Sequence, residues 1–197
     1  GRFFPDIVTL KRKILNPVLS LFTHKIVAIS ESTKEALVKN ENFPRKAVSV
    51  IHNGVSDLQG LTNSKLLRDK LSIAPDNVIF GTVSRLQPIK NQKMMIIAFA
   101  SILEKHPKSK LLIVGDGPSK ADLMAFVDNF GIAQSVIFTG FKVNALAYTE
   151  IIDVFLLTSY SEGLSMALIE AMALSKPCIA TNVGGNAELI ENNLNGF

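Results

Sequence analysis

The feature that most constrains the fold of this chain is a regular alternation of short apolar runs with segments that carry helix signals. Each run has the length of a strand, and its residues are apolar on both faces, which is typical of parallel strands covered by helices on two sides. Such alternation predicts an α/β fold, a parallel sheet flanked by helices. We expect strands at residues 25–29, 47–51, 78–83, 110–114, 136–139, 153–157 and 178–181.

Helix signals lie between these runs. Ser30 is a suitable N-cap for a helix over residues 31–38, and Gly131 is a suitable stop for a helix over 119–130. We expect the remaining helices at residues 64–71, 91–106, 166–174 and about 187–190.

The composition excludes several classes of protein. Hydrophobic residues make up 47% of the 197 residues, which is enough for a packed core and argues against disorder. We expect no transmembrane helix, because no apolar run approaches about 18 residues, and the N-terminus lacks the order of a signal peptide. Cys178 is the single cysteine and the histidines are far apart, so we expect neither a disulfide framework nor a bound metal. A cytoplasmic location is the resulting expectation.

Positive charge is concentrated near the N-terminus. The net charge is +4, and residues 1–15 contain Arg2, Lys11, Arg12 and Lys13. The remaining chain is nearly neutral and has no tryptophan, so we expect no nucleic-acid partner. Residues 10–22 combine basic and apolar side chains, which fits either peripheral contact with the inner face of a membrane or an ordinary amphipathic helix.

Glycine and polar residues gather after the later strands. The carboxyl ends of parallel strands lie at one edge of a sheet, where open α/β folds bind ligands. The pattern therefore fits a binding cleft, although glycines that only turn the chain would produce it too. The loops concerned contain Arg85, residues 115–117, Gly140, residues 159–165 and residues 184–185.

Two glutamates stand out near the expected helix at 166–174. Glu170 is the only charged side chain between Gly163 and Ser175, and glutamate is seldom buried without a partner. It therefore either meets a structural donor or faces a ligand. Glu162 precedes the helix, where it is either a solvated loop charge or an acceptor for ligand hydroxyls. Ser165 between them is a suitable N-cap, and the free amides of the first turn suit an anion.

Arg85 and Lys90 follow one strand and have no obvious acidic partners nearby. They are either solvated charges or the cations that neutralise a diphosphate.

The common motifs of other nucleotide-binding proteins and of serine hydrolases are absent from the sequence. The turn at residues 115–117 is not a dinucleotide fingerprint, because Lys120 occupies the position of the third glycine. Neither a phosphate-binding loop of the G-x-x-x-x-G-K-[ST] type nor a G-x-S-x-G elbow occurs.

In combination these residues resemble a retaining GT-B glycosyltransferase of glycosyltransferase family 4. Glu162-Gly163 through Glu170-Ala171 resembles the E-x7-E motif of that family, and Ser84-Arg85-Leu86 with Lys90-Asn91 resembles its diphosphate loop. Further segments follow in the order of the family: Val27–Ser30, Val50–Val55, Val114–Pro118, Phe138–Gly140 and Val183–Glu188. Departures at Ser84, Asn91 and His24 remove no charged group that the family uses.

The resemblance implies transfer of a sugar from a nucleoside-diphosphate sugar to a hydroxyl acceptor, a glycan or lipid-linked precursor, with retention of configuration and without a metal. Arg85 and Lys90 would stabilise the diphosphate, and Glu162 would bind the sugar hydroxyls. The other donor-binding residues would be Glu170 at the ribose, the amides of Gly163, Leu164 and Ser165, the loops at Gly115 and Gly140, and Phe141 with Lys142 near the base.

The resemblance also implies a domain division. Residues 1–55 resemble the end of an acceptor-side domain, residues 56–75 a linker, and residues 76–197 a Rossmann-like donor domain without its closing segment. We therefore expect activity to need the remainder of the acceptor domain.

Three alternatives to an active glycosyltransferase stay open. They are a non-catalytic nucleotide-sugar binding module, an inactive fragment and, from another class, a dehydrogenase-type domain.

Overall fold

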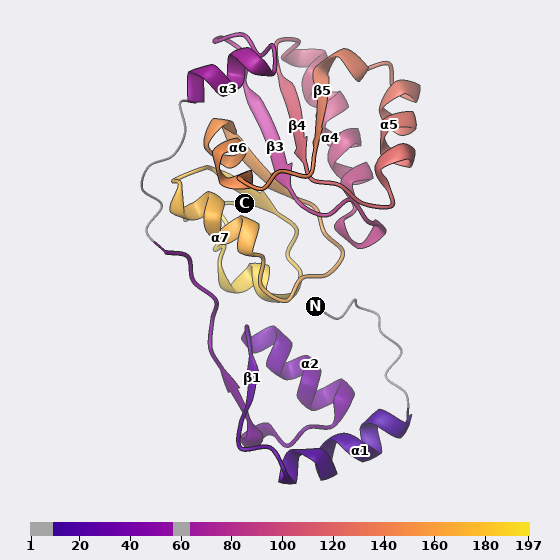
Figure 1. Cartoon of the computed structure of the whole chain (residues 1–197), viewed down its shortest axis with the longest axis vertical. Helices are drawn as coiled ribbons and strands as arrows, with labels where there is room; N and C mark the ends of the chain where they lie inside the picture. The colour runs from indigo at the N-terminus through magenta and orange to yellow at the C-terminus, as the bar shows by residue number, and fades with distance from the viewer. Residues whose placement is uncertain (1–9, 57–63) are drawn as a thin grey trace.

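The computed structural model describes residues 10–56 and 64–197. Within these ranges the chain contains a five-stranded parallel sheet in the C-terminal domain, residues 64–197, and a two-stranded parallel sheet in the N-terminal part, residues 10–56 (Figure 1). The expected α/β fold with a parallel sheet flanked by helices is confirmed. The finer division at residues 55 and 75 stays a prediction.

The order of the five strands places two distant segments side by side. The strands are β3 (Ile79–Val83), β4 (Lys110–Val114), β5 (Val136–Gly140), β6 (Val154–Leu157) and β7 (Cys178–Ala180), in the order β5-β4-β3-β6-β7. The chain moves outward from β3 to β5 and then returns to the other side of β3. The loops that follow β3 and β6 therefore flank the topological switch point, where ligands bind in open α/β sheets.

Helices cover both faces of this sheet. Figure 1 shows α4 (Gln92–Lys105) and α5 (Lys120–Asn129) on one side, with α6 (Ala145–Ile151) and α7 (Met166–Ala173) on the other. The core is divided accordingly, because successive residues of β4 point to opposite faces. Leu111 and Ile113 pack with α4 and α5, whereas Leu112 and Val114 pack with α6 and α7.

Two elements of the C-terminal domain differ from expectation. The helix α6 was not anticipated from the sequence, and the segment expected as a helix at about 187–190 is a 3₁₀ helix, η4 (Gly184–Glu188). The helix α3 (Ser64–Lys70) falls within the expected linker but packs against α6, and Ile73 lies in the core. Short 3₁₀ turns also occur at η1 (Arg45–Ala47), η2 (Pro88–Lys90) and η3 (Ala133–Ser135).

The N-terminal part consists of α1 (Leu10–Leu21), β1 (Ile26–Ala28), α2 (Glu31–Glu41) and β2 (Val48–Val50). Ser30 caps α2 as expected, since its hydroxyl accepts a hydrogen bond from the amide of Thr33. Unlike an ordinary amphipathic helix, α1 buries polar side chains and exposes its apolar ones. Its buried residues are Asn16 and Ser20, and Asn16 donates to the backbone carbonyl of Glu41.

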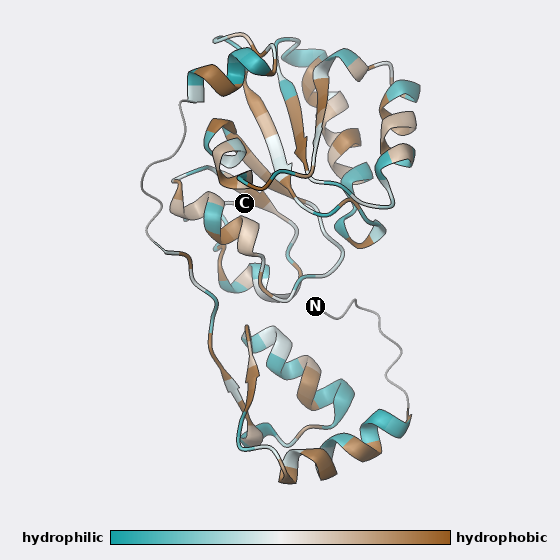
Figure 2. Cartoon of the chain, in the orientation of Figure 1, coloured by the Kyte–Doolittle hydropathy of each residue, from teal (hydrophilic) through white to brown (hydrophobic). Residues whose placement is uncertain are grey.

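The apolar side chains of α1 are therefore exposed. Hydrophobic residues colour much of this helix brown in Figure 2, and the exposed ones are Leu10, Ile14, Leu15, Val18, Leu19 and Leu21, followed by Phe22. None of the helices in residues 10–56 and 64–197 is long and apolar enough to cross a membrane.

Candidate functional site

The candidate site is built on two loops that meet at the switch point between β3 and β6. The amide of Tyr160 donates to the carbonyl of Ile89 at 2.8 Å. The hydroxyl of Thr158 donates to the carbonyls of Lys90 and Asn91 at 3.2 and 3.1 Å. These bonds fix the loop after β6 against the loop after β3, so residues far apart in sequence have a defined geometry.

The central contact of the site is an ion pair. The ammonium of Lys90 donates to Oε1 of Glu162 at 2.6 Å, and the hydroxyl of Ser159 donates to the same oxygen. The side chains of Lys90 and Glu162 are 20% and 9% exposed. The expectation that Lys90 has no acidic partner was wrong, because β6 lies directly beside β3 and carries Glu162 to the lysine.

Arg85 lies in the same loop as Lys90 but is exposed to solvent. Its backbone is held by Gln92, the first residue of α4, which the sequence did not single out. The Gln92 side chain is 2% exposed and donates to the Arg85 carbonyl at 3.1 Å and to the Ser84 hydroxyl at 3.2 Å. A buried amide at the start of a helix thus fixes the backbone that presents Arg85.

Residues 163–165 connect Glu162 to the start of α7. Ser165 is the N-cap, and its hydroxyl accepts a hydrogen bond from the amide of Leu168 at 3.3 Å. Leu164 and Ser165 are buried, with 5% and 6% of their surfaces exposed. Gly163 has Ile29 and Thr33 of the N-terminal part within 4 Å of the position a Cβ would take. These three residues therefore form a closely packed segment that links Glu162 of the ion pair to the first turn of α7.

Glu170 lies one turn further along α7, on the helix that also contributes Leu168 and Ala171 to the core. The residue is half-buried, and burial raises the pKa of its carboxyl group. The carboxylate of Glu170 has no hydrogen bond or ion pair within the described ranges. A partly desolvated carboxylate without a protein donor has the chemistry to accept hydrogen bonds from a ligand.

The glycine after β4 and the glycine that ends β5 bring backbone segments into close contact. Gly115 has a φ angle of 135°, and a Cβ there would overlap the carbonyl oxygen of Ser84. The amide of Gly115 donates to the carbonyl of Gly140 at 3.0 Å. The loop with Gly140 thus contacts the Gly115 loop, which contacts the loop with Arg85.

Phe141 and Lys142 follow Gly140 in the loop after β5. The Phe141 side chain is 74% exposed, and the ammonium of Lys142 lies 5.7 Å from the ring centre of Tyr148. Within the described residues, no hydrogen bond or ion pair joins either side chain to Lys90 or Glu162. The structure therefore brings Lys90 and Glu162 into direct contact and leaves Phe141 and Lys142 at the periphery.

The late glycine pair supports the loop of Glu162 from the other side. A Cβ at Gly184 would overlap the carbonyl oxygen of Glu162, and a Cβ at Gly185 would overlap that of Gly163. Thr181 adds a further tie, because its hydroxyl donates to the carbonyl of Ser159 at 2.7 Å. Sequence reasoning assigned this segment to a glycine loop, and the structure shows which backbone it contacts.

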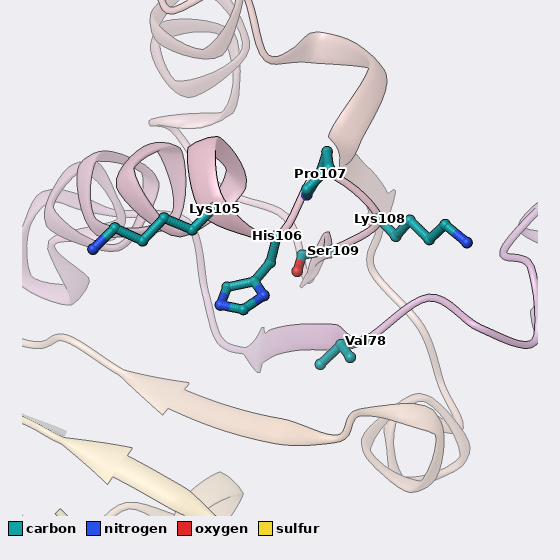
Figure 3. Close-up of a pocket in the computed structure, with 6 residues that line it drawn as sticks. All are labelled: Val78, Lys105, His106, Pro107, Lys108 and Ser109. Atoms are coloured by element: carbon teal, nitrogen blue, oxygen red, sulfur yellow. The ribbon is translucent and has the colours of Figure 1, made fainter.

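A surface hollow of about 330 Å³ lies away from this site, at the amino ends of β3 and β4. In Figure 3, Lys105 and Lys108 point away from each other on its two sides, and Lys108 is paired with Asp76 at 2.6 Å. The lining residues are Val78, Lys105, His106, Pro107, Lys108 and Ser109. Within the described part of the chain, no group of three or more His, Cys, Asp or Glu residues is placed to hold a metal.

Comparison with known proteins agrees with this geometry. The model of the family "Glycosyl transferases group 1" matches residues 63–197. The chain belongs to this glycosyltransferase family. The resemblance to a glycosyltransferase family noted from the sequence is thereby confirmed.

Two curated relatives indicate the range of the family. The chain is 30% identical to UDP-Gal:alpha-D-GlcNAc-diphosphoundecaprenol alpha-1,3-galactosyltransferase of Escherichia coli, over 96% of this chain and 51% of that protein. It is also 30% identical to N-acetyl-alpha-D-glucosaminyl L-malate synthase of Bacillus anthracis, over 78% of this chain and 40% of that protein. The chain thus spans about half the length, or less, of these relatives.

Solved structures give the same assignment of fold. HepE of Anabaena, whose crystal structure was determined in complex with UDP and glucose, superposes with a TM-score of 0.86 and 26% identity. The match covers 98% of this chain and 55% of that one. This glycosyltransferase chain is therefore similar in structure to slightly more than half of a GT-B enzyme.

Proposed function

We propose that this chain forms the donor-binding part of a retaining glycosyltransferase that uses a nucleoside-diphosphate sugar. The observation that carries the proposal is the contact between Lys90 and Glu162 at the switch point of the sheet. A cation and a hydroxyl acceptor lie side by side there, next to the first-turn amides of α7. This combination matches the chemistry of a sugar attached to a diphosphate.

The arrangement supports a division of labour along the donor. Lys90 and Arg85 neutralise the diphosphate, and Glu162 accepts hydrogen bonds from the sugar hydroxyls. Glu170 accepts those of the ribose, since its half-buried carboxylate is otherwise without a donor in the described structure. The amides of residues 163–165 face the phosphates and the sugar, and Phe141 with Lys142 lies toward the base.

The proposed transfer proceeds on one face of the sugar. The bond between the anomeric carbon and the diphosphate oxygen breaks, and the acceptor oxygen bonds to the same face of that carbon. The acceptor proton passes to a phosphate oxygen of the leaving nucleoside diphosphate. Glu162 is already engaged with Lys90 and Ser159, which favours a binding role for it over that of a nucleophile. Arg85 and Lys90 supply positive charge at the leaving group, so we propose that no metal is required.

The acceptor is proposed to be a glycan or a lipid-linked precursor, as for the diphosphoundecaprenol-linked substrate in the name of the Escherichia coli relative.

We further propose that α1 contacts the cytoplasmic face of an anionic membrane, because exposed apolar side chains lie beside exposed Lys11 and Lys13. Co-sedimentation with vesicles containing anionic lipid tests this, with a Lys11→Glu/Lys13→Glu variant as control. Equal sedimentation with neutral vesicles, or none with anionic ones, would refute the contact.

Calorimetric titration of the 197-residue chain with UDP, GDP, ADP and UDP-glucose tests the donor site. We expect micromolar to millimolar binding of one nucleotide class, unchanged by EDTA. Binding of NAD instead would favour the dehydrogenase-type alternative. Sugar transfer by the longer protein, compared with the chain alone, separates an enzyme from a non-catalytic binding module and tests whether activity needs the remainder of the acceptor domain.

A further inference from the structure

Glu188 has a position that the donor site does not account for. It is the last residue of η4 in the C-terminal domain, yet its carboxylate contacts the N-terminal part. One oxygen accepts from the amide of Glu31 at 2.9 Å, and the other accepts from the amide of Ser32 at 2.8 Å. Both amides belong to the first turn of α2, where unpaired donors and the helix dipole favour a negative charge.

His52 completes the same contact. His52 lies two residues after the end of β2, and its Nε2 atom is 3.1 Å from Oε2 of Glu188. Burial by itself raises the pKa of Glu188, but the amides of Ser32 and Glu31 and the ring of His52 lower it overall. Within the described ranges, 10–56 and 64–197, the hydrogen bonds between the two parts of the chain converge on this one carboxylate.

The same short helix also supports the loop of Glu162. η4 begins with Gly184 and Gly185, whose Cα atoms lie too close to the backbone carbonyls of Glu162 and Gly163 for any side chain. Asn186 is 1% exposed, and its amide donates to the carbonyl of Thr181 at 3.1 Å. One turn of backbone therefore holds the loop of Glu162 at its start and α2 at its end.

The loop of Glu162 touches α2 from its own side as well. At Gly163 a Cβ would lie 3.1 Å from Cδ1 of Ile29 and 3.5 Å from the hydroxyl of Thr33. A shift of α2 relative to the C-terminal domain would consequently disturb both the Glu188 contact and the packing of Gly163 in the loop of Glu162.

We propose that Glu188 is a positioning residue that latches the N-terminal part onto the C-terminal domain and thereby aligns the loop of Glu162 for the donor sugar. The proposal rests on the donor site described above. It adds that η4 couples two things: the contact between the N-terminal part and the C-terminal domain, and the position of the Glu162 loop at the sugar end of the donor site.

Hydrogen exchange on the 197-residue chain tests the coupling directly. Glu188→Ala removes both acceptors of the α2 amides, and we expect exchange to become about tenfold faster in residues 31–34 and also in residues 159–165. Glu188→Gln keeps one acceptor oxygen and should give a smaller increase in both segments. Glu191→Gln is the matched control, because Glu191 is exposed on the next stretch of chain and should change neither segment.

The pattern of exchange decides the outcome. Faster exchange confined to residues 31–34 in both Glu188 variants would show an ordinary helix cap and overturn the proposal. If Glu188→Ala also speeds exchange in β3 and β4, that variant is generally unfolded. The exchange of Glu188→Gln in residues 31–34 and 159–165 then decides whether the coupling exists.

Ligand titration provides a second measurement. With Glu188→Ala we expect unchanged affinity for UDP and roughly tenfold loss of any additional affinity for UDP-glucose, since only the sugar end is misaligned. A wild-type chain that binds no UDP would refute the donor site proposed above, whereas the exchange results would still establish or refute the latch.

Discussion

The ammonium of Lys90 and the carboxylate of Glu162 lie 2.6 Å apart, so the residue assigned to the phosphates is bonded to the residue assigned to the sugar. The pair forms because β3 and β6 are neighbours at the switch point, although 72 residues separate its members in sequence. Its disruption should affect the fold as well as the ligand, which distinguishes Lys90 from the exposed Arg85.

Lys90→Ala should lower both stability and nucleotide affinity, whereas Arg85→Ala should lower affinity alone. Removing Lys90 leaves the largely buried Glu162 carboxylate with the Ser159 hydroxyl as its remaining donor in the described structure. We expect each variant to weaken UDP binding by about 1.5–3 kcal/mol, the usual scale for a charged hydrogen bond. Melting curves and calorimetry measure the two effects. Equal melting temperatures for the two variants would contradict a structural role for the ion pair.

Glu170→Gln should raise the melting temperature at pH 7 while weakening nucleotide binding. Burial raises the pKa of Glu170 in the folded chain, so this group favours folding at low pH and that contribution is lost as the pH rises from the unfolded pKa through the folded one. Glutamine stays neutral and removes this dependence. Melting curves between pH 4 and 8, together with UDP titration, are the measurements.

Glu162→Gln is the matched comparison for Glu170. Because its proposed partner is the sugar, we expect near-normal affinity for UDP and a loss of about 1.5–3 kcal/mol in the additional binding of UDP-glucose. If both glutamine variants bind UDP and UDP-glucose like the wild type, the two carboxylates are structural and the proposed donor contacts fail.

Gly184→Ala should displace the loop of Glu162. Its φ angle of 53° disfavours a side chain, and the added Cβ would overlap the Glu162 carbonyl oxygen. We expect a lower melting temperature and loss of the preference for UDP-glucose over UDP. Gly54→Ala is the control, since nothing lies within 4 Å of the position its Cβ would take. Equal behaviour of the two variants would refute the contact.

Cys178 should react with thiol reagents only when the chain opens. The side chain is 1% exposed, its sulfhydryl donates to the Lys176 carbonyl at 3.1 Å, and burial raises its pKa to about 11. Because the thiolate is the reactive form, labelling at pH 8 should be roughly a thousandfold slower than in the unfolded chain if opening costs about 4 kcal/mol. Labelling by Ellman's reagent, with and without urea, measures this. Rapid labelling without urea would show that β7 opens locally.

The sequence by itself determined the local structure and the type of fold. Strand-length apolar runs predicted the strands to within one or two residues, and Ser30 and Ser165 both cap the helices expected to follow them. These features depend on near neighbours in the chain, namely side-chain periodicity and hydroxyls within reach of first-turn amides. The isolated charge of Glu170 in an apolar segment was visible for the same reason.

Contacts between distant segments were decided only by the tertiary structure. Strand order placed Glu162 beside Lys90, packing buried Gln92 beneath the Arg85 loop, and η4 brought Glu188 to the start of α2. The burial of Asn16 and the exposure of the apolar residues of α1 also depend on which neighbour the helix meets, here the end of α2. A carboxylate's partner is set by which loops meet in space, and no periodicity or cap in the sequence records that adjacency.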